Sequence, residues 1–213
     1  MTHASIACFA KVFCFGDSLT SGSSPPLVES FPYGPHLEKA IRTTSGKEDS
    51  MVRWKGYPGW TASNLLQEGG LGALLDDIQF KTGTHVDLVI ILAGTNDLAY
   101  EKNPDIIFKD IMSIHEIAHG RSIHTLAIGV PDSAWQQQSV ETANVAREVN
   151  AKLQEWSETH SVLVDFEPFP IVKFDPSSGY WAPDGLHFSP QGYQYLGENI
   201  APKVTTILSN IPK

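Results

Sequence analysis

Five short apolar runs, rich in β-branched and aromatic residues, alternate along this chain with longer segments that have helical spacing. The runs cover residues 11–15, 51–57, 87–94, 123–130 and 162–166. The helical segments cover residues 34–44, 72–80, 104–119, 140–159 and 190–210, the last of them expected to be interrupted near Pro202. Strands that are apolar throughout are typical of a parallel sheet with both faces covered. The alternation therefore predicts an α/β fold with about five parallel strands and helices on both sides.

Length and composition favour one domain. The 213 residues are 41% hydrophobic and 18% charged, and they contain no internal repeat, low-complexity tract or linker. A chain of this size can bury a substantial core in one unit. We therefore expect residues 1–213 to form a single domain, while the sequence does not indicate its oligomeric state.

The charge and the N-terminus restrict partners and compartment. Fifteen Lys and Arg against 24 Asp and Glu give a formal net charge of −9, which repels nucleic acid and anionic membrane surfaces. No segment is long and apolar enough to predict a membrane span. The stretch MTHASIACFAKVFCF lacks a basic leader and is broken by Lys11, so we expect a cytoplasmic protein. Cys8 and Cys14 are too few for a disulfide framework and are expected to be buried or idle thiols.

Glycine turns with small polar side chains follow the first three predicted strands. They are Gly16-Asp17-Ser18 within FCFGDSLTSGSS, GYPGW at 56–60 and GTND at 94–97. Ligands of such sheets lie at the carboxyl ends of the strands. Ser18 is a candidate nucleophile there, although the hydroxyl-rich loop would also suit a phosphate. The simplest alternative is that these loops only turn the chain and cap helices.

A second constellation lies near the end of the chain, in APDGLHFSPQGY. Asp184 precedes His187 by three residues at the start of the last helical pattern, so one turn can hold both side chains together. A carboxylate there can fix the imidazole tautomer and leave the other ring nitrogen free as a base. With Ser18, these residues complete a nucleophile, a base and an orienting carboxylate. Ser18, Gly59 and Asn96 could donate hydrogen bonds to the oxyanion of acyl transfer.

Taken together, FGDSL, the glycine after the second strand, GTND and DGLH resemble the SGNH, or GDSL, hydrolases in the family's order. The resemblance spans Phe15 to His187. It implies a flavodoxin-like three-layer α/β/α sandwich and cofactor-independent ester hydrolysis. It also implies Ser18, Asp184 and His187 as the triad, with Gly59 and Asn96 in the oxyanion hole. The small size is similar to that of the family's arylesterases, acetylesterases and thioesterase/lysophospholipase members.

The second block departs from the family pattern, because Pro58 and Trp60 flank Gly59. Gly56 is therefore a rival for the oxyanion glycine, and Gly59 is preferred since Thr61 and Asn64 follow it as a polar helix start. Two acidic residues inside the blocks, Asp17 and Asp97, are expected to brace loops rather than to act on substrate.

The substrate is expected to be a small ester with a short acyl or an aryl group. Trp60, Tyr180 and Trp181 are candidates for lining its pocket, with packing on the core as the alternative for each. Acetylated sugars, thioesters and lysophospholipids remain alternative substrates. No cofactor and no metal are expected.

Two other functions compete with ester hydrolysis. HEIAH, from His115 to His119, matches the H-E-x-x-H zinc motif with Glu116 as the base. However, the predicted buried stripe of that helix leaves both histidines on its flank, and no metzincin extension follows. A flavin-binding module would explain the hydroxyl-rich first loop, but it would not explain Asp184, His187 or Asn96.

Overall fold

The computed structural model describes residues 11–45, 49–169 and 174–211. Its sheet has five parallel strands in the order β2-β1-β3-β4-β5, which confirms the predicted α/β fold. The strands are β1 (Lys11–Asp17), β2 (Met51–Tyr57), β3 (Leu88–Leu92), β4 (His124–Ile128) and β5 (Val164–Glu167). The assignment of residues 1–213 to one domain stays a prediction.

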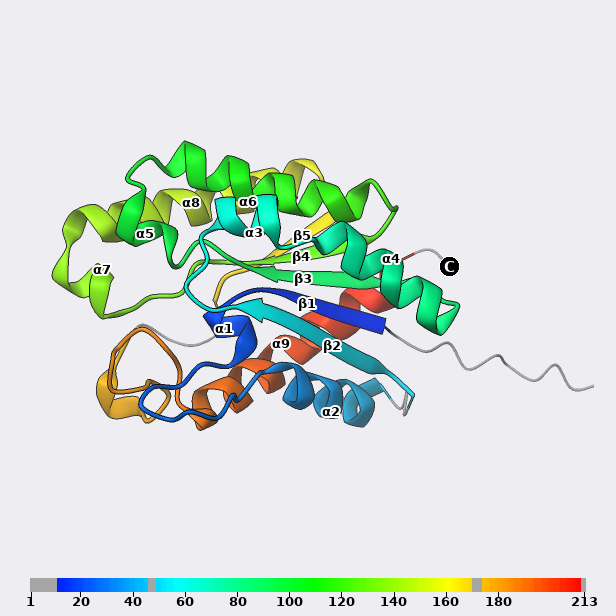
Figure 1. Ribbon diagram of the computed structural model, residues 1–213, viewed down its shortest axis with the longest axis horizontal. Coiled ribbons are helices and arrows are strands. Elements are labelled where there is room, and N and C mark those ends of the chain that lie inside the picture. Colours follow the sequence, from blue (N-terminus) through cyan, green and yellow to red (C-terminus); the bar gives the residue numbers. More distant parts are fainter. Residues whose placement is uncertain (1–10, 46–48, 170–173, 212–213) are drawn as a thin grey trace, which may run out of the picture.

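Helices cover both faces of the sheet, so the molecule has three layers (Figure 1). One face carries α3 (Ala62–Glu68), α4 (Leu71–Thr82), α5 (Asp97–Tyr100), α6 (Pro104–His119), α7 (Ala134–Gln138) and α8 (Val140–Thr159). The opposite face carries α1 (Ser18–Ser21), α2 (Gly34–Ser45) and α9 (Pro190–Asn210). A 3₁₀ turn, η1 (Pro176–Ser178), lies in the segment that leads to α9.

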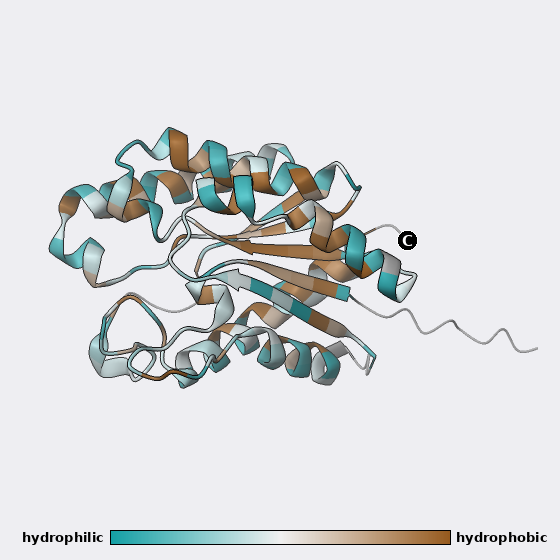
Figure 2. Ribbon diagram, viewed as in Figure 1, coloured by the Kyte–Doolittle hydropathy of each residue, from teal (hydrophilic) through white to brown (hydrophobic). Residues whose placement is uncertain are grey.

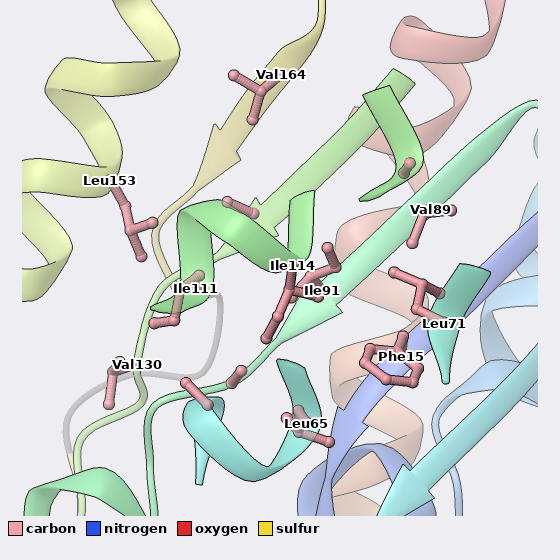
Figure 3. Close-up of a cluster of buried hydrophobic side chains, with 14 of the residues drawn as sticks. Phe15, Leu65, Leu71, Val89, Ile91, Ile111, Ile114, Val130, Leu153 and Val164 are labelled. Carbon is pink, nitrogen blue, oxygen red and sulfur yellow. The ribbon is translucent and has the colours of Figure 1, made fainter. Parts of the chain in front are cut away.

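The core lies in two clusters, one on each face of the sheet, and β3 supplies both. All five residues of β3 are buried, with Val89 and Ile91 in one cluster and Leu88, Ile90 and Leu92 in the other. Figure 3 shows Ile91 between Ile114 of α6 and Phe15 of β1, while Figure 2 shows β3 as apolar along its length. A central parallel strand has no solvent-facing side, so a continuous apolar run is what it requires.

The strand order brings the first three strand ends to one place. The chain passes from β1 outward to β2 and then back across β1 to β3, so the direction of winding reverses beside β1. Gly16 is paired in register with Gly56 of β2 and with Leu92 of β3. The loops that follow therefore lie at one edge of the sheet, at the left of Figure 1. Ligands of open α/β sheets bind where the strand order reverses in this way.

Some predicted boundaries were wrong. Helix α9 continues through Pro202 instead of breaking there, because Ile200, Ala201 and Val204 on both sides of the proline are buried in the core. The missing N–H costs one hydrogen bond, and the packing of the apolar face outweighs it. The short helices α1, α5 and α7 were not predicted, since four or five residues make too few turns to show a period.

Two further predictions from the sequence concern the cysteines and membrane-spanning helices. Cys14 is a buried free thiol, as expected, and burial raises its pKa to about 12. Cys8 lies outside the described residues. Within the described ranges, no helix has the length and apolar character needed to cross a bilayer.

Candidate active site

Ser18 lies at the end of β1, as the first residue of the four-residue helix α1. Asp17 is the N-cap of α1, and its Oδ1 accepts a hydrogen bond from the backbone N–H of Leu19 at 2.9 Å. Gly22 ends the turn with a left-handed φ of 82°. The Ser21 hydroxyl donates to the carbonyl of Ser18 within the same turn. The chain thus reverses sharply and leaves the Ser18 hydroxyl directed away from the loop's own hydrogen bonds.

A chain of hydrogen bonds joins Ser18 to the far end of the sequence. His187 Nε2 lies 2.9 Å from Ser18 Oγ, and His187 Nδ1 lies 2.7 Å from Asp184 Oδ2. An ionised carboxylate can only accept, so Nδ1 carries the proton and Nε2 is free to accept from the serine. The three predicted residues are therefore brought together in the arrangement of a nucleophile, a base and an orienting carboxylate.

The sequence pattern placed Asp184 and His187 at the start of the last helix. The structure holds them instead in a turn before that helix. Helix α9 starts at Pro190, after both residues. An antiparallel bridge between Trp181 and Phe188 closes the turn, and the Ala182 N–H donates to the His187 carbonyl. Asp184 acts within it as an Asx turn residue, whose Oδ1 accepts from two backbone N–H groups, each at 3.0 Å.

The hydrogen bonds of Asp184 keep its carboxyl ionised. Partial burial alone would raise its pKa, but the backbone and side-chain hydrogen bonds from His187 and the backbone N–H of Leu186 outweigh it and leave the pKa lowered. Asp184 is therefore a carboxylate at neutral pH.

Asn96 follows β3 and is 9% exposed. It occupies the N-cap position of α5 but makes no side-chain capping hydrogen bond. Its Nδ2 instead donates to the backbone carbonyl of Trp60, 36 residues away, at 2.9 Å. A side-chain amide has two N–H donors, so the one bound by Trp60 orients the group and the second can donate elsewhere.

The two rival glycines have different surroundings. A Cβ atom on Gly56 would lie 2.2 Å from Ser21 N and 2.5 Å from the Asp17 carbonyl, so Gly56 lets β2 pack beneath the nucleophile turn. Gly59 is exposed, has a φ of 81°, and a Cβ there would meet nothing within 4 Å. Close packing explains Gly56, whereas Gly59 faces open space beside the strand ends.

The three candidate aromatic residues have separate environments. Trp60 is partly exposed and stacks on Tyr57, with ring centroids 4.3 Å apart. Trp181 is 7% exposed and packs against Phe174 and Phe188 in the core cluster. The ring of Tyr180 lies on Tyr195, at 4.5 Å. The contacts of Trp181 and Tyr180 are those expected for the alternative of packing on the core.

The acidic residues of the two motif blocks brace loops. Asp17 is completely buried; burial raises its pKa to about 7, the Leu19 N–H partly offsets this, and the Asp97 carboxylate raises it further. Asp97 is 4% exposed and accepts from the Ala62 N–H with both of its oxygens. Neither the Trp60 carbonyl nor the Ala62 N–H could have been found from the sequence, because any residue supplies such backbone groups.

The two histidines of the H-E-x-x-H motif lie on α6, and both are within hydrogen-bonding distance of the Thr125 hydroxyl. His115 is fully buried, which corrects the prediction that it lies on the flank of the helix, and its Nδ1 lies 2.7 Å from Thr125 Oγ1. His119 Nε2 lies 2.9 Å from the same oxygen. The part of the chain that the structure describes holds no group of three or more His, Cys, Asp and Glu side chains placed to bind a metal. A zinc-protease centre therefore finds no third ligand there.

Comparison with known proteins agrees with the fold and identifies a family. The model of the GDSL-like lipase/acylhydrolase family matches residues 14–195. No match was found among curated proteins.

Solved structures resemble the chain over nearly its whole length. The lipase/acylhydrolase from Enterococcus faecalis is 23% identical with a TM-score of 0.63, and the match covers 93% of this chain and 96% of that one. The family 3 carbohydrate esterase of Clostridium thermocellum is 19% identical with a TM-score of 0.70, covering 97% and 100%. A GDSL-like lipase from Bacteroides thetaiotaomicron is 22% identical with a TM-score of 0.61, covering 91% and 88%. At these identities the likeness shows the fold.

Proposed function

The chain belongs to the GDSL-like lipase/acylhydrolase family, and on that premise we propose that it is a serine esterase that hydrolyses carboxylic esters through an acyl-enzyme on Ser18. The observation that carries the proposal is the unbroken chain of hydrogen bonds from Asp184 through His187 to the Ser18 hydroxyl. These three groups come from positions 169 residues apart at the most, and a packed loop has no structural need for this alignment.

The proposed reaction begins with attack of Ser18 Oγ on the ester carbonyl, while His187 Nε2 takes the hydroxyl proton. The ionised Asp184 stabilises the imidazolium that forms, because the Nδ1–H group of His187 donates its hydrogen bond to the negatively charged carboxylate. His187 returns the proton to the departing alcohol. Water, deprotonated by the same imidazole, then attacks the acyl-enzyme and releases the acid.

The negative charge of the tetrahedral intermediate requires donors that are in place beforehand. We assign this role to the backbone N–H groups of Ser18 and Gly59 and to the Asn96 amide. Support for Asn96 comes from its amide, which is held by the Trp60 carbonyl and is not used as a cap. Support for Gly59 comes from its position in open space on the loop after β2, while packing accounts for Gly56.

Substitution of Ser18 tests the proposal. We expect Ser18→Ala to abolish ester hydrolysis without unfolding the protein, because the hydroxyl makes its side-chain contact with His187 and not with the core. A fluorophosphonate is expected to label the native enzyme once, at Ser18, and Ser21→Ala is the matched control that retains labelling. Near-native turnover by Ser18→Ala, or an adduct mapped to another residue, would overturn the assignment.

We propose short-chain acyl or aryl esters as the substrates. Support comes from Trp60, which directly follows the exposed Gly59 and whose ring stacks on Tyr57. A bulky aromatic pair next to the proposed oxyanion glycine favours a small acyl group. We expect the rate on p-nitrophenyl esters to fall from acetate through butyrate and octanoate to laurate. Rates that rise along this series would indicate a lipase or a thioesterase, and preference for an acetylated sugar panel would indicate a carbohydrate acetylesterase.

A further inference from the structure

Asp97 joins the loop after β2 to the loop after β3 through one backbone group. Its two carboxylate oxygens lie 3.1 Å and 2.9 Å from the backbone nitrogen of Ala62, the first residue of α3. The first N–H groups of a helix have no partner within the helix. Thr61 and Asn64 form a capping box that satisfies the N–H groups of each other. Asp97, from a different element, accepts the N–H of Ala62.

A second hydrogen bond runs between the same two loops in the opposite sense. Asn96 Nδ2 donates to the Trp60 carbonyl, while Asp97 accepts from Ala62. The adjacent residues Asn96 and Asp97, after β3, therefore bind Trp60 and Ala62, which are two positions apart after β2. A single hydrogen bond leaves a loop free to pivot, whereas two along the chain fix both its distance and its orientation.

The buried position of Asp97 makes an ionised carboxylate there unfavourable for folding. The residue is 4% exposed, no cation pairs with it among the described residues, and burial raises its pKa to about 6. That pKa already includes a decrease from the hydrogen bond of the Ala62 N–H and smaller increases from the Asp110 and Glu101 carboxylates, and Asp17 also lies near enough to interact with Asp97. Burial of an unpaired charge opposes folding, so a specific contact must hold this group in place.

We infer that Asp97 is a positioning residue of the oxyanion hole, which fixes the Gly59 loop against Asn96 so that both can donate to one oxygen atom. This inference rests on the proposed function. Gly59 precedes Ala62 by three residues and is itself exposed at a turn, with few contacts of its own. Asp97 acts on the reaction through these donors and not on the substrate.

The test compares Asp97→Ala with Asp87→Ala, since an asparagine oxygen could still accept the hydrogen bond from Ala62. Asp87 is a matched control, because its Oδ2 also accepts a backbone N–H between two strands, from Lys11 at 2.7 Å, but at the opposite end of β1 and β3. We expect Asp97→Ala to lower kcat about tenfold to hundredfold with little change in KM, which is part of the effect of losing an oxyanion donor. Asp87→Ala is expected to leave kcat unchanged. Equal kcat for the two variants would overturn the inference.

Ala62→Pro removes the same hydrogen bond from the other side and keeps the test valid should Asp97→Ala not fold. Proline is suited to the first position of a helix, and Thr61, with φ −76° and ψ 168°, already has the extended backbone that a following proline requires. We expect the same fall in kcat. A native kcat for Ala62→Pro would show that the contact does not position the donors.

A double-mutant cycle with Asn96→Ala separates positioning from a general loss of structure. If Asp97 works through the oxyanion donors, adding Asp97→Ala to Asn96→Ala lowers kcat by less than about threefold, because groups that act as a unit are not additive. Full multiplication of the two losses would contradict the inference.

Amide hydrogen exchange separates failure of this inference from failure of the proposed function. We expect faster exchange in residues 59–62 of Asp97→Ala than in Asp87→Ala, whether or not any ester is hydrolysed. Unchanged exchange would refute the link between the loops. Wild-type enzyme that is inactive and also resists the fluorophosphonate would refute ester hydrolysis, and with it the role of Asp97 in an oxyanion hole. The exchange measurement would still decide whether Asp97 links the two loops.

Discussion

At the scale of single residues, Asn96 shows why position in a motif does not reveal what a side chain does. An asparagine directly before a short helix is ordinarily a cap, and the sequence allowed that alternative. The side chain makes no capping hydrogen bond, and it spans to the loop after β2 instead. One amide N–H thus orients the other.

Substitutions of Asn96 distinguish the two roles. We expect Asn96→Ala to lower kcat about 10² to 10³-fold with a small change in KM, since the lost interaction is made in the transition state. Its stability is expected to fall by about 1 kcal/mol, from the lost hydrogen bond to Trp60. Steady-state kinetics and denaturant unfolding measure both effects.

Asn96→Asp is the sharper variant. It preserves the shape but places a carboxylate oxygen against the Trp60 carbonyl and a negative charge beside the oxyanion. We expect it to be a poorer enzyme than Asn96→Ala at neutral pH. Wild-type kcat for Asn96→Asp would show that Asn96 is not an oxyanion donor.

At the scale of elements, α6 and β4 are joined by a hydroxyl between two imidazoles. Thr125 of β4 lies within hydrogen-bonding distance of His115 and His119, and its Oγ1 can donate to one ring nitrogen while it accepts from the other. Trp156 of α8 packs against both rings. This arrangement gives the zinc-like motif a packing role, at a distance from the strand ends that carry Ser18.

Thr125→Val tests that role. The variant keeps the size of the side chain but leaves ring nitrogens unpaired in the core, so we expect a loss of about 1–3 kcal/mol in the free energy of unfolding with unchanged kcat. Thr43→Val, at an exposed helical hydroxyl, is the control and is expected to change stability by less than about 0.5 kcal/mol. Loss of activity without loss of stability, accompanied by sensitivity to a chelator, would favour the zinc interpretation.

At the scale of the whole molecule, buried titratable groups impose opposite dependences of stability on pH. Asp17 has a folded pKa of about 7, against about 3.9 when unfolded, so between these values only the folded state retains the proton. Its contribution to stability therefore falls as pH rises through this window. Burial lowers the pKa of His115, so its contribution is present above about pH 6.5 and is lost as pH falls.

The variant Asp17→Asn tests the pH-dependent contribution of Asp17 to stability. The amide oxygen can still accept from the Leu19 N–H, while the charge is removed. We expect the variant and the wild type to differ little near pH 4 and the variant to gain, by pH 8, on the order of a few kcal/mol relative to the wild type. Urea unfolding at pH 4.5, 6 and 8 measures the difference. A difference independent of pH would show that Asp17 ionises normally in the folded protein.

The sequence by itself determined the class of fold and the residues of the candidate site. Apolar runs and helical periods are local properties of the chain, so they predicted five parallel strands without knowledge of any contact. The prediction that all five are buried was wrong for the edge strands β2 and β5, most of whose residues are not buried. Ser18, Asn96 and the closely spaced pair Asp184 and His187 could be found because chemistry needs particular side chains at strand ends. The family blocks then supplied their roles as expectations.

Only the tertiary structure decided which groups meet. The order β2-β1-β3 puts Gly56 under the nucleophile turn and leaves Gly59 in the open, and no sequence period distinguishes the two. The same holds for the burial of His115 and of Trp181. Backbone atoms decide the rest: the Trp60 carbonyl and the Ala62 N–H orient Asn96 and Asp97 from about 35 residues away. Every residue carries such groups, so their use depends on the packing of the strands and helices that bring them together.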